Sequence, residues 1–362
     1  MTDKIRVSEY EMYCGIDVDK KKYVVLFIDK QDRLRRAQMP SDPEVLIRFA
    51  RKHYGGMRVL YVYEAGPTGF GLYDALVAAG EDCIVAAPSM VPRAPGQRVK
   101  NNRLDAYGLA TNLRGGKISG IKVPSLFYRD LRHLVQLRDT YVRQGTRLKQ
   151  RIKSLLLVEG KDFPSERWSN FAIEELKRME CREIVRFKLD LLLSSTETAK
   201  AELLKASREL RRYCKEDEES ERNLEYLMST SAIGWITASH FLARVGDWKQ
   251  LESVKKTCGF LGLGASENST GERINRGAIT AVGDRRLRAK IIQTAWVAIR
   301  KDKELREFFD DICRRNPPNY GRKKAIIAVA RKLVVRMHAV LRDQRCYEKE
   351  RTGIIKPATV SN

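Results

Sequence analysis

The sequence lacks the residue patterns of membrane, secreted and zinc-binding proteins. No stretch approaches the roughly 18 consecutive apolar residues that indicate a membrane-spanning helix, and the start of the chain, Met1-Thr2-Asp3-Lys4, has no signal-peptide core. The seven cysteines form no Cys-x-x-Cys pair and have no histidine partner at zinc-ligand spacing. We therefore expect a soluble, cytoplasmic protein with no membrane partner, whose cysteines are reduced and mostly buried.

Acidic residues are scarce relative to basic ones. The 362 residues include 69 Lys or Arg against 46 Asp or Glu, which gives a net charge of +23. An excess of this size usually serves binding to a polyanion, and nucleic acid is the commonest one. The basic residues are spread along the whole chain, which favours nucleic acid over an anionic membrane or a role in solubility alone.

The first third of the chain is predicted to form an α/β layer. Helices are expected at 43–53 and 70–79, and apolar runs predict strands at 12–18, 23–28, 33–39, 57–64 and 82–87. A strand meander followed by alternating strands and helices is typical of a mixed sheet covered by helices. Pro124 closes this domain, which we place at residues 1–123.

Three carboxylates of this domain are candidates for a metal site. Asp17 and Glu64 end the first and fourth predicted strands, and Asp105 opens an apolar, helical segment. Asp17 and Glu64 become neighbours if those two strands pair. Such a set can hold two divalent cations about 3.5–4 Å apart for in-line attack on a phosphodiester, and carboxylate oxygens are the ligands that Mg²⁺ prefers. Each acid taken singly is more often a turn former or a cap.

Residues 124–218 are predicted to be helical. Apolar residues recur every seven positions along a first helix, and a second helix over 184–213 carries an apolar stripe. The heptad positions are Phe127, Leu134, Tyr141, Leu148 and Leu155, with Leu131, Leu137 and Ile152 in part of the second seam. An antiparallel hairpin, a coiled-coil dimerisation arm and a plainly packed helix pair all fit this pattern.

Residues 219–345 predict a mainly helical C-terminal domain, with basic helix from 285 to about 341, and residues 346–362 predict a basic tail. The segment 231–238 resembles the turn of a helix–hairpin–helix, which offers backbone N–H groups to a phosphate. Hydroxyls gather in the loop 266–271, which is either an ordinary turn or a source of a nucleophile. No histidine lies nearby in sequence, so a nucleophile here requires activation by the distant carboxylates, within one chain or between subunits.

Five segments, in order, resemble the DEDD-type transposases of the insertion-sequence 110 group, which includes the Piv-type DNA invertases. Gly15-Ile16-Asp17-Val18 resembles the family's first-acid strand, and Glu64-Ala65-Gly66-Pro67-Thr68-Gly69 resembles its second-acid segment. Residues 95–106 are similar to the segment of the third and fourth acids. Residues 261–271 and 277–288 are similar to the serine-bearing signature and its continuation, so the similarity covers almost the whole chain.

The resemblance implies an N-terminal RuvC-like (ribonuclease H-like) α/β domain, a helical coiled-coil linker and a mainly α transposase domain. It implies DNA strand cleavage and exchange that depend on Mg²⁺ (or Mn²⁺), and a serine that becomes linked to a DNA phosphate. The nucleophile implied is Ser269, or else Thr270, and the metal ligands implied are Asp17, Glu64, Asn102 and Asp105. The implied partners are double-stranded DNA, a guide (bridge) RNA and further copies of the chain in a homodimer or homotetramer, in the bacterial cytoplasm.

Three positions depart from the family pattern. Asn102 stands where the family usually has its third acid, and its amide offers an oxygen but no charge. Many relatives have Ser-Ser-Gly where this chain has Ser269-Thr270-Gly271. The family's Pro-Gly-Ile-Gly turn is replaced by Ser231-Ala232-Ile233-Gly234. Two alternatives to a transposase therefore stay open: a RuvC-like, structure-specific DNA nuclease that uses metal-activated water, and a catalytically impaired nucleic-acid-binding protein.

Overall fold

The computed structural model describes residues 5–92, 102–246, 249, 253–267 and 276–348. The chain divides into two compact units, Met1–Val123 and Pro124–Asn362. Within the described ranges, no helix has the length and apolar character needed to cross a membrane.

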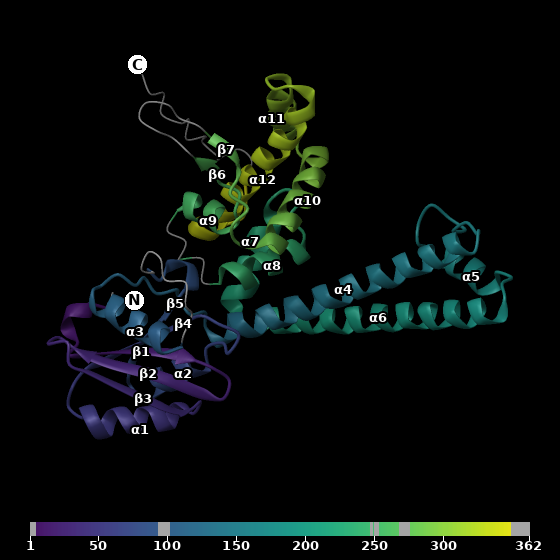
Figure 1. The fold of residues 1–362 in the computed structure, drawn as a ribbon. Helices are drawn as coiled ribbons and strands as arrows, with labels where there is room; N and C mark the ends of the chain where they lie inside the picture. Colours follow the sequence, from purple (N-terminus) through teal and green to yellow (C-terminus); the bar gives the residue numbers. More distant parts are fainter. Residues whose placement is uncertain (1–4, 93–101, 247–248, 250–252, 268–275, 349–362) are drawn as a thin grey trace, which may run out of the picture. The chain divides into compact units, whose positions relative to one another are not determined.

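The first unit is built on a five-stranded sheet with the order β3-β2-β1-β4-β5 (Figure 1). Its strands are β1 (Met12–Val18), β2 (Lys22–Asp29), β3 (Leu34–Pro40), β4 (Val59–Glu64) and β5 (Asp82–Ala86). The first three strands form an antiparallel meander, and β4 and β5 join β1 in parallel because α1 (Pro43–Tyr54) and α2 (Gly71–Ala78) carry the chain back. The predicted mixed α/β layer is confirmed, and so is the pairing of the first and fourth strands.

Along β1, β2 and β4 both faces of the sheet are apolar and covered, whereas the edge strand β3 is largely exposed. One face, with Ile16 and Tyr61, packs into a core that includes α1 and α2. The other, with Leu26 and Val62, packs against α3 (Asn102–Arg114). Successive residues of a strand point to opposite faces, so strands buried on both sides read as continuous apolar runs. Two 3-10 helices, η1 (Val7–Glu9) and η2 (Pro88–Met90), complete the described elements of this unit.

The second unit begins with a long antiparallel hairpin formed by α4 (Leu126–Val158) and α6 (Glu183–Lys215), with α5 (Asn170–Arg178) between them in sequence (Figure 1). The predicted apolar stripes largely meet in this hairpin, but Leu137 is 44% exposed. Leu137 lies two positions after the buried Val135, which puts it about 200° away around the helix. Its assignment to the second seam was therefore wrong.

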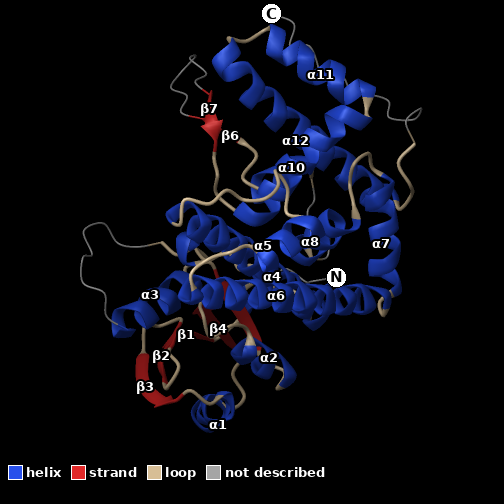
Figure 2. Ribbon diagram, turned by 90° about the vertical axis from the view of Figure 1, so that its right-hand side faces the viewer, coloured by secondary structure: helices blue, strands red, loops and turns tan. Residues whose placement is uncertain are grey.

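The rest of the second unit is mainly helical, with one small two-stranded sheet (Figure 2). Its elements are α7 (Glu218–Ser229), α8 (Trp235–Val245), α9 (Val254–Phe260), β6 (Ala265–Glu267), β7 (Arg276–Ile279), α10 (Arg285–Lys301), α11 (Lys303–Arg314) and α12 (Pro318–Asp343). The core of these helices includes Leu131 of α4 and Leu210 of α6, so the base of the hairpin is packed into it.

The basic helical segment predicted for 285–341 consists of three helices, α10, α11 and α12. Asp302 ends α10 and caps α11, its carboxylate accepting a hydrogen bond from the backbone N–H of Leu305. Pro317 and Pro318 then begin α12. An aspartate cap and proline at the first helical position are ordinary helix-start signals, and they explain the two breaks.

Candidate functional site

Two of the predicted carboxylates lie at the same level of neighbouring strands. β1 and β4 pair in parallel up to Ile16 opposite Tyr63, and Asp17 and Glu64 are the next residue along each strand. Neighbouring strands are roughly 4.8 Å apart, and residues at one level point to the same face. Both side chains are half-buried. The ends of β1 and β4 therefore present two acids side by side.

These two carboxylates lie on the face of the sheet that α3 covers. Asp17 pairs with Val24 of β2, and Glu64 pairs with Ala86 of β5. Val24 and Ala86 both belong to the core formed against α3. Because residues at one level share a face, Asp17 and Glu64 point toward the same side of the sheet as this helix.

The C-terminal end of α3 is tied to the opposite end of the sheet. The Arg114 guanidinium donates to the backbone oxygen of Asp29 at 3.1 Å and forms an ion pair with Asp32 at 2.6 Å. Asp29 pairs with Met12, the first residue of β1. The last turn of α3 therefore lies near the beginning of β1.

Gly15 fixes the middle of α3 against β1. A Cβ added at Gly15 would lie 2.2 Å from the backbone oxygen of Ala106 and 2.5 Å from the backbone nitrogen of Ala110, so the helix backbone rests directly on the strand. Because its last turn lies near the start of β1, α3 runs antiparallel to that strand. Its first turn, which contains Asp105, is therefore directed toward the end that carries Asp17.

The first turn of α3 carries the third predicted carboxylate, that of Asp105. Asp105 is half-buried and lies in the first turn of α3, which begins at Asn102. The side chain of Asn102 lies outside what the structure describes. Among the described residues, no three His, Cys, Asp or Glu side chains are grouped closely enough to hold a metal ion. The donor chemistry of the two strand acids and this turn nevertheless fits a hard cation such as Mg²⁺.

A tight turn of small residues follows the half-buried Glu64. The backbone N–H of Gly69 donates to the carbonyl of Gly66 at 3.2 Å, and Pro67 and Thr68 form the exposed corner. Gly69 has a φ of +71°, a conformation that glycine adopts at little cost. Small residues at this corner leave room for a large substrate to approach Glu64.

The predicted nucleophiles, Ser269 and Thr270, lie outside the described residues. The strands on either side of that segment, β6 and β7, are described and pair antiparallel. Ser266 of β6 donates its hydroxyl hydrogen to the carbonyl oxygen of Ala278 at 2.9 Å. The third hydroxyl of the predicted loop is therefore engaged in holding the hairpin together.

The chain segments at the base of this hairpin pass close to one another. A Cβ at Gly262 would lie 2.1 Å from the carbonyl oxygen of Val282, and one at Gly283 would lie 2.1 Å from that of Phe260. Arg288 of α10 is only 8% exposed and donates to the carbonyl of Leu261 at 3.0 Å. These anchoring roles were not predicted, although the glycines in Gly-x-Gly and before Asp284 are a signal of close backbone approach.

The segment that resembles a helix–hairpin–helix turn does connect two helices, α7 and α8. Ala232 in this turn has a φ of +65°, and the N–H of Ile233 donates to the carbonyl of Thr230 at 3.0 Å. Gly234 caps α8, and the Arg211 guanidinium lies 4.8 Å from the centre of the Trp235 ring at the start of that helix. A cation beside a helix N-terminus is compatible with contact to a DNA phosphate.

Comparison with known proteins places both halves of the chain. Residues 14–159 match the DEDD transposase domain of the IS110 type, and residues 224–310 match the transposase family IS116/IS110/IS902. The chain is 30% identical over 324 residues to y4qE of Sinorhizobium fredii, a proposed transposase, a match covering 88% of this chain and 76% of y4qE.

Two further relatives are named after insertion sequences. The transposase for insertion sequence element IS1533 of Leptospira borgpetersenii is 24% identical over 252 residues, which is 67% of this chain and 72% of the relative. The transposase for insertion sequence element IS1111A of Coxiella burnetii is 25% identical over 254 residues, which is 68% of each chain.

Proposed function

This chain belongs to the IS116/IS110/IS902 family of transposases, and on that premise we propose that it is a DNA recombinase of an insertion sequence that cleaves and rejoins DNA through a composite site. We assign the metal-binding half of the site to Asp17, Glu64 and Asp105, with Asn102 as a neutral fourth ligand. We assign the nucleophile to Ser269.

The placement of Asp17 and Glu64 is the observation that carries this proposal. They lie at one level of neighbouring strands, on the face covered by α3, and the turn that contains Asp105 is directed toward them. Two half-buried carboxylates side by side at the ends of neighbouring strands repel each other when both are charged. Asp17 and Glu64 would hold a divalent cation whose positive charge offsets that repulsion.

Mg²⁺ or Mn²⁺ fits these donors because carboxylate and amide oxygens are hard ligands. When bound, such a cation supplies Lewis-acid stabilisation of charge on the phosphodiester. Asn102 contributes an oxygen without a charge, so we expect a site with one negative charge fewer than the family pattern gives. A weaker affinity for the metal follows from that difference.

The proposed covalent step is a phosphoryl transfer to Ser269. Its Oγ forms a bond to a DNA phosphorus and loses its proton, while one P–O bond of the phosphodiester breaks and the released DNA hydroxyl takes up a proton. The resulting phosphoserine ester keeps the DNA phosphate activated. A hydroxyl of another strand can then attack that phosphorus, which restores Ser269 and joins the strands. Thr270 is the alternative nucleophile.

We extend the proposal to fold and partners. The first unit is proposed to have a RuvC-like, ribonuclease H-like fold, residues 124–218 to act as a coiled-coil linker, and 219–345 to form the transposase domain. The net charge of +23 supports contact with DNA at the element ends and target, and with a guide RNA that pairs with them. We place the protein in the bacterial cytoplasm, acting as a homodimer or homotetramer.

A covalent adduct assay tests the nucleophile. Incubated with Mg²⁺ and labelled element ends, the wild-type protein should form a denaturant-resistant protein–DNA adduct, and Ser269→Ala should form none while binding DNA normally. Ser266→Ala is the matched control, because the Ser266 hydroxyl is bonded to Ala278, and it should keep the adduct. An undiminished adduct in Ser269→Ala would move the assignment to Thr270. Cleavage that survives loss of every hydroxyl in 266–270 would replace the proposal with a nuclease that uses metal-activated water.

A further inference from the structure

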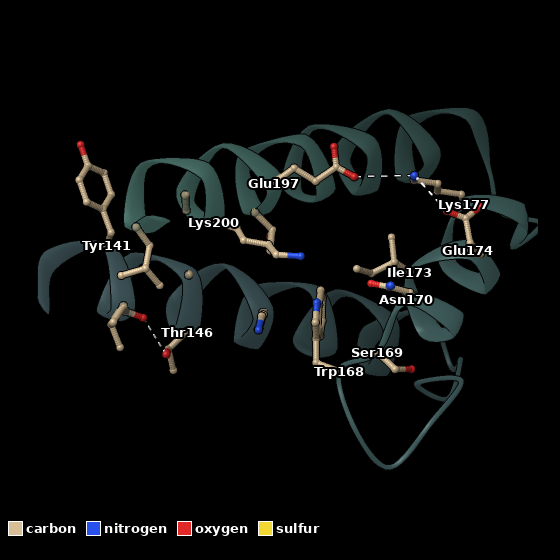
Figure 3. Close-up of a pocket in the computed structure, with 16 residues that line it drawn as sticks. Tyr141, Thr146, Trp168, Ser169, Asn170, Ile173, Glu174, Lys177, Glu197 and Lys200 are labelled. Atoms are coloured by element: carbon tan, nitrogen blue, oxygen red, sulfur yellow. Dashed lines mark hydrogen bonds and ion pairs between the residues drawn. The ribbon is translucent and has the colours of Figure 1, made fainter. Parts of the chain in front are cut away.

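The helical hairpin of the second unit contains a pocket that strand exchange, as proposed above, does not use. The pocket has a volume of about 540 Å³ and lies between α4 and α6, with Trp168 and the start of α5 at one side (Figure 3). All of its lining residues belong to the second unit, whereas Asp17 and Glu64 belong to the first. The function of the pocket can therefore be tested apart from DNA cleavage.

A supported aromatic surface forms one wall of the pocket. The Trp168 ring stacks on Phe163, with 5.2 Å between the ring centres and 22° between the planes. The Lys149 ammonium lies 5.2 Å from the centre of the Trp168 ring, and Lys153 lies 4.7 Å from that of Phe163. The stacked pair holds the indole in place as a flat, partly exposed platform bordered by cations.

The charges of the pocket are not balanced. Lys177 forms ion pairs with Glu174 at 3.3 Å and with Glu197 at 3.7 Å, so its charge is neutralised locally. Lys149 and Lys200 form no ion pair with any residue that the structure describes. Figure 3 shows Lys200 extending from α6 toward Trp168. The lining therefore carries three lysines against two glutamates, and Lys149 and Lys200 are the two lysines without an ion pair beside the aromatic platform.

The segment of α4 that contributes to the pocket is basic in sequence as well. Residues 140–158 of α4 contain no acidic residue, and their Arg or Lys side chains occur at 143, 147, 149, 151 and 153. A ligand drawn to this part of the hairpin therefore carries negative charge along its length. An acidic peptide would pair with the lysines but would leave the indole without a partner, and a neutral aromatic compound would leave the lysines without one.

We propose that this pocket binds one unpaired nucleotide of a single-stranded nucleic acid. The base stacks on Trp168, and its phosphates contact Lys149 and Lys200. Stacking on an aromatic side chain in a basic groove is how proteins bind single strands without reading their sequence. The volume suits one nucleotide, and a base-paired duplex is too wide to enter. The ligand class rests on the proposed function, whereas the pocket and its charges do not.

Binding of short oligonucleotides to the full-length protein tests this proposal. Labelled RNA and DNA strands of about 12 nucleotides, and a duplex of the same sequence, are each titrated with the protein, and binding is measured by fluorescence anisotropy. Trp168→Ala should weaken single-strand binding about tenfold or more, Trp168→Phe should retain most of it, and duplex affinity should stay unchanged. The RNA and DNA arms show which strand is preferred. An equal loss for the duplex, or no loss for either single strand, would overturn the proposal.

A second pair of variants guards against misfolding. Lys200→Ala removes an exposed pocket side chain and should weaken single-strand binding, whereas Lys188→Ala, exposed on the same helix outside the pocket, should not. If Trp168→Ala does not fold, the proposal is overturned when Lys200→Ala and Lys188→Ala bind single strands with equal affinity. Asp17→Asn should bind single strands like the wild type even though it cannot cleave DNA, so a failed pocket and a failed recombinase give different results.

An independent readout is photocrosslinking with strands that carry 5-iodouracil. The crosslinked peptide should contain Trp168, because a stacked base lies in contact with the ring. Crosslinks confined to peptides outside the hairpin would contradict a nucleotide in this pocket.

Discussion

Replacing Gly15 with alanine perturbs the contact that seats α3 on the sheet. The added Cβ would lie 2.2 Å from the backbone oxygen of Ala106, and real Cβ contacts are essentially never shorter than 3.0 Å. The obstacle is helix backbone, which cannot rotate away as a side chain can. The helix must withdraw by about 1 Å, and overpacking of this kind costs about 1–3 kcal/mol of stability.

The same displacement should impair catalysis. The first turn of α3 carries Asp105, and a shift of about 1 Å in a reacting group can lower a rate about 100-fold. We therefore expect Gly15→Ala to cleave element-end DNA about 100-fold more slowly in Mg²⁺ while it remains folded at the assay temperature. Affinity for DNA should change little, because the strand and helix surfaces keep their charges.

Gly108 of the same helix provides the matched control. A Cβ at Gly108 meets no atom within 4 Å, so Gly108→Ala only replaces a poor helix former with a good one. It should raise the free energy of unfolding by up to about 1 kcal/mol and leave cleavage unchanged. Urea unfolding followed by circular dichroism and single-turnover cleavage measure the two effects. A Gly15→Ala protein with wild-type stability and cleavage rate would refute this placement of α3.

Two further predictions concern the second unit. Ala232 has a φ of +65°, which costs a residue with a Cβ about 1–2 kcal/mol, so Ala232→Gly should raise the free energy of unfolding by about 1 kcal/mol; an unchanged or lower value in urea titration would contradict this. Burial alone would raise the pKa of the Asp139 carboxyl, but hydrogen bonds and charges from His240 and Lys290 lower it to about 2, from an ordinary value of 3.8. Because the folded pKa lies below the unfolded one, a stabilisation of about 2 kcal/mol is present above pH about 4 and is lost as the pH falls toward 2. The stability gap between wild type and Asp139→Asn should therefore narrow over that range, and a gap that stays constant would show that the carboxyl titrates normally.

The sheet and the strand acids could be predicted from local patterns. Apolar runs bounded by polar turns located the strands, and the expected pairing of the first and fourth strands put Asp17 beside Glu64, which the structure confirms. The helix breaks at Asp302 and Pro317 were not predicted, although both have local signals in the sequence. These features depend on residues that are close together in the sequence, so they can be predicted from it.

Contacts between distant segments could not be predicted in this way. Nothing near Gly15 indicates that α3, some ninety residues later, rests on its Cα, because a glycine in a strand equally fits a bulge. The prediction that Leu137 lies in the second seam was wrong for a related reason. A heptad pattern does not say which side chains a partner helix will cover. The roles of Ser269, Asn102 and the metal stay predictions.

Adduct formation by Asp17→Asn tests most directly whether the carboxylates and the serine act on one phosphodiester. The wild-type protein in Mg²⁺ should give a DNA adduct that mass spectrometry maps to Ser269. Asp17→Asn, and wild-type protein in excess EDTA, should bind the same DNA and give no adduct. A Ser269 adduct that forms at the wild-type rate in either case would contradict the composite site.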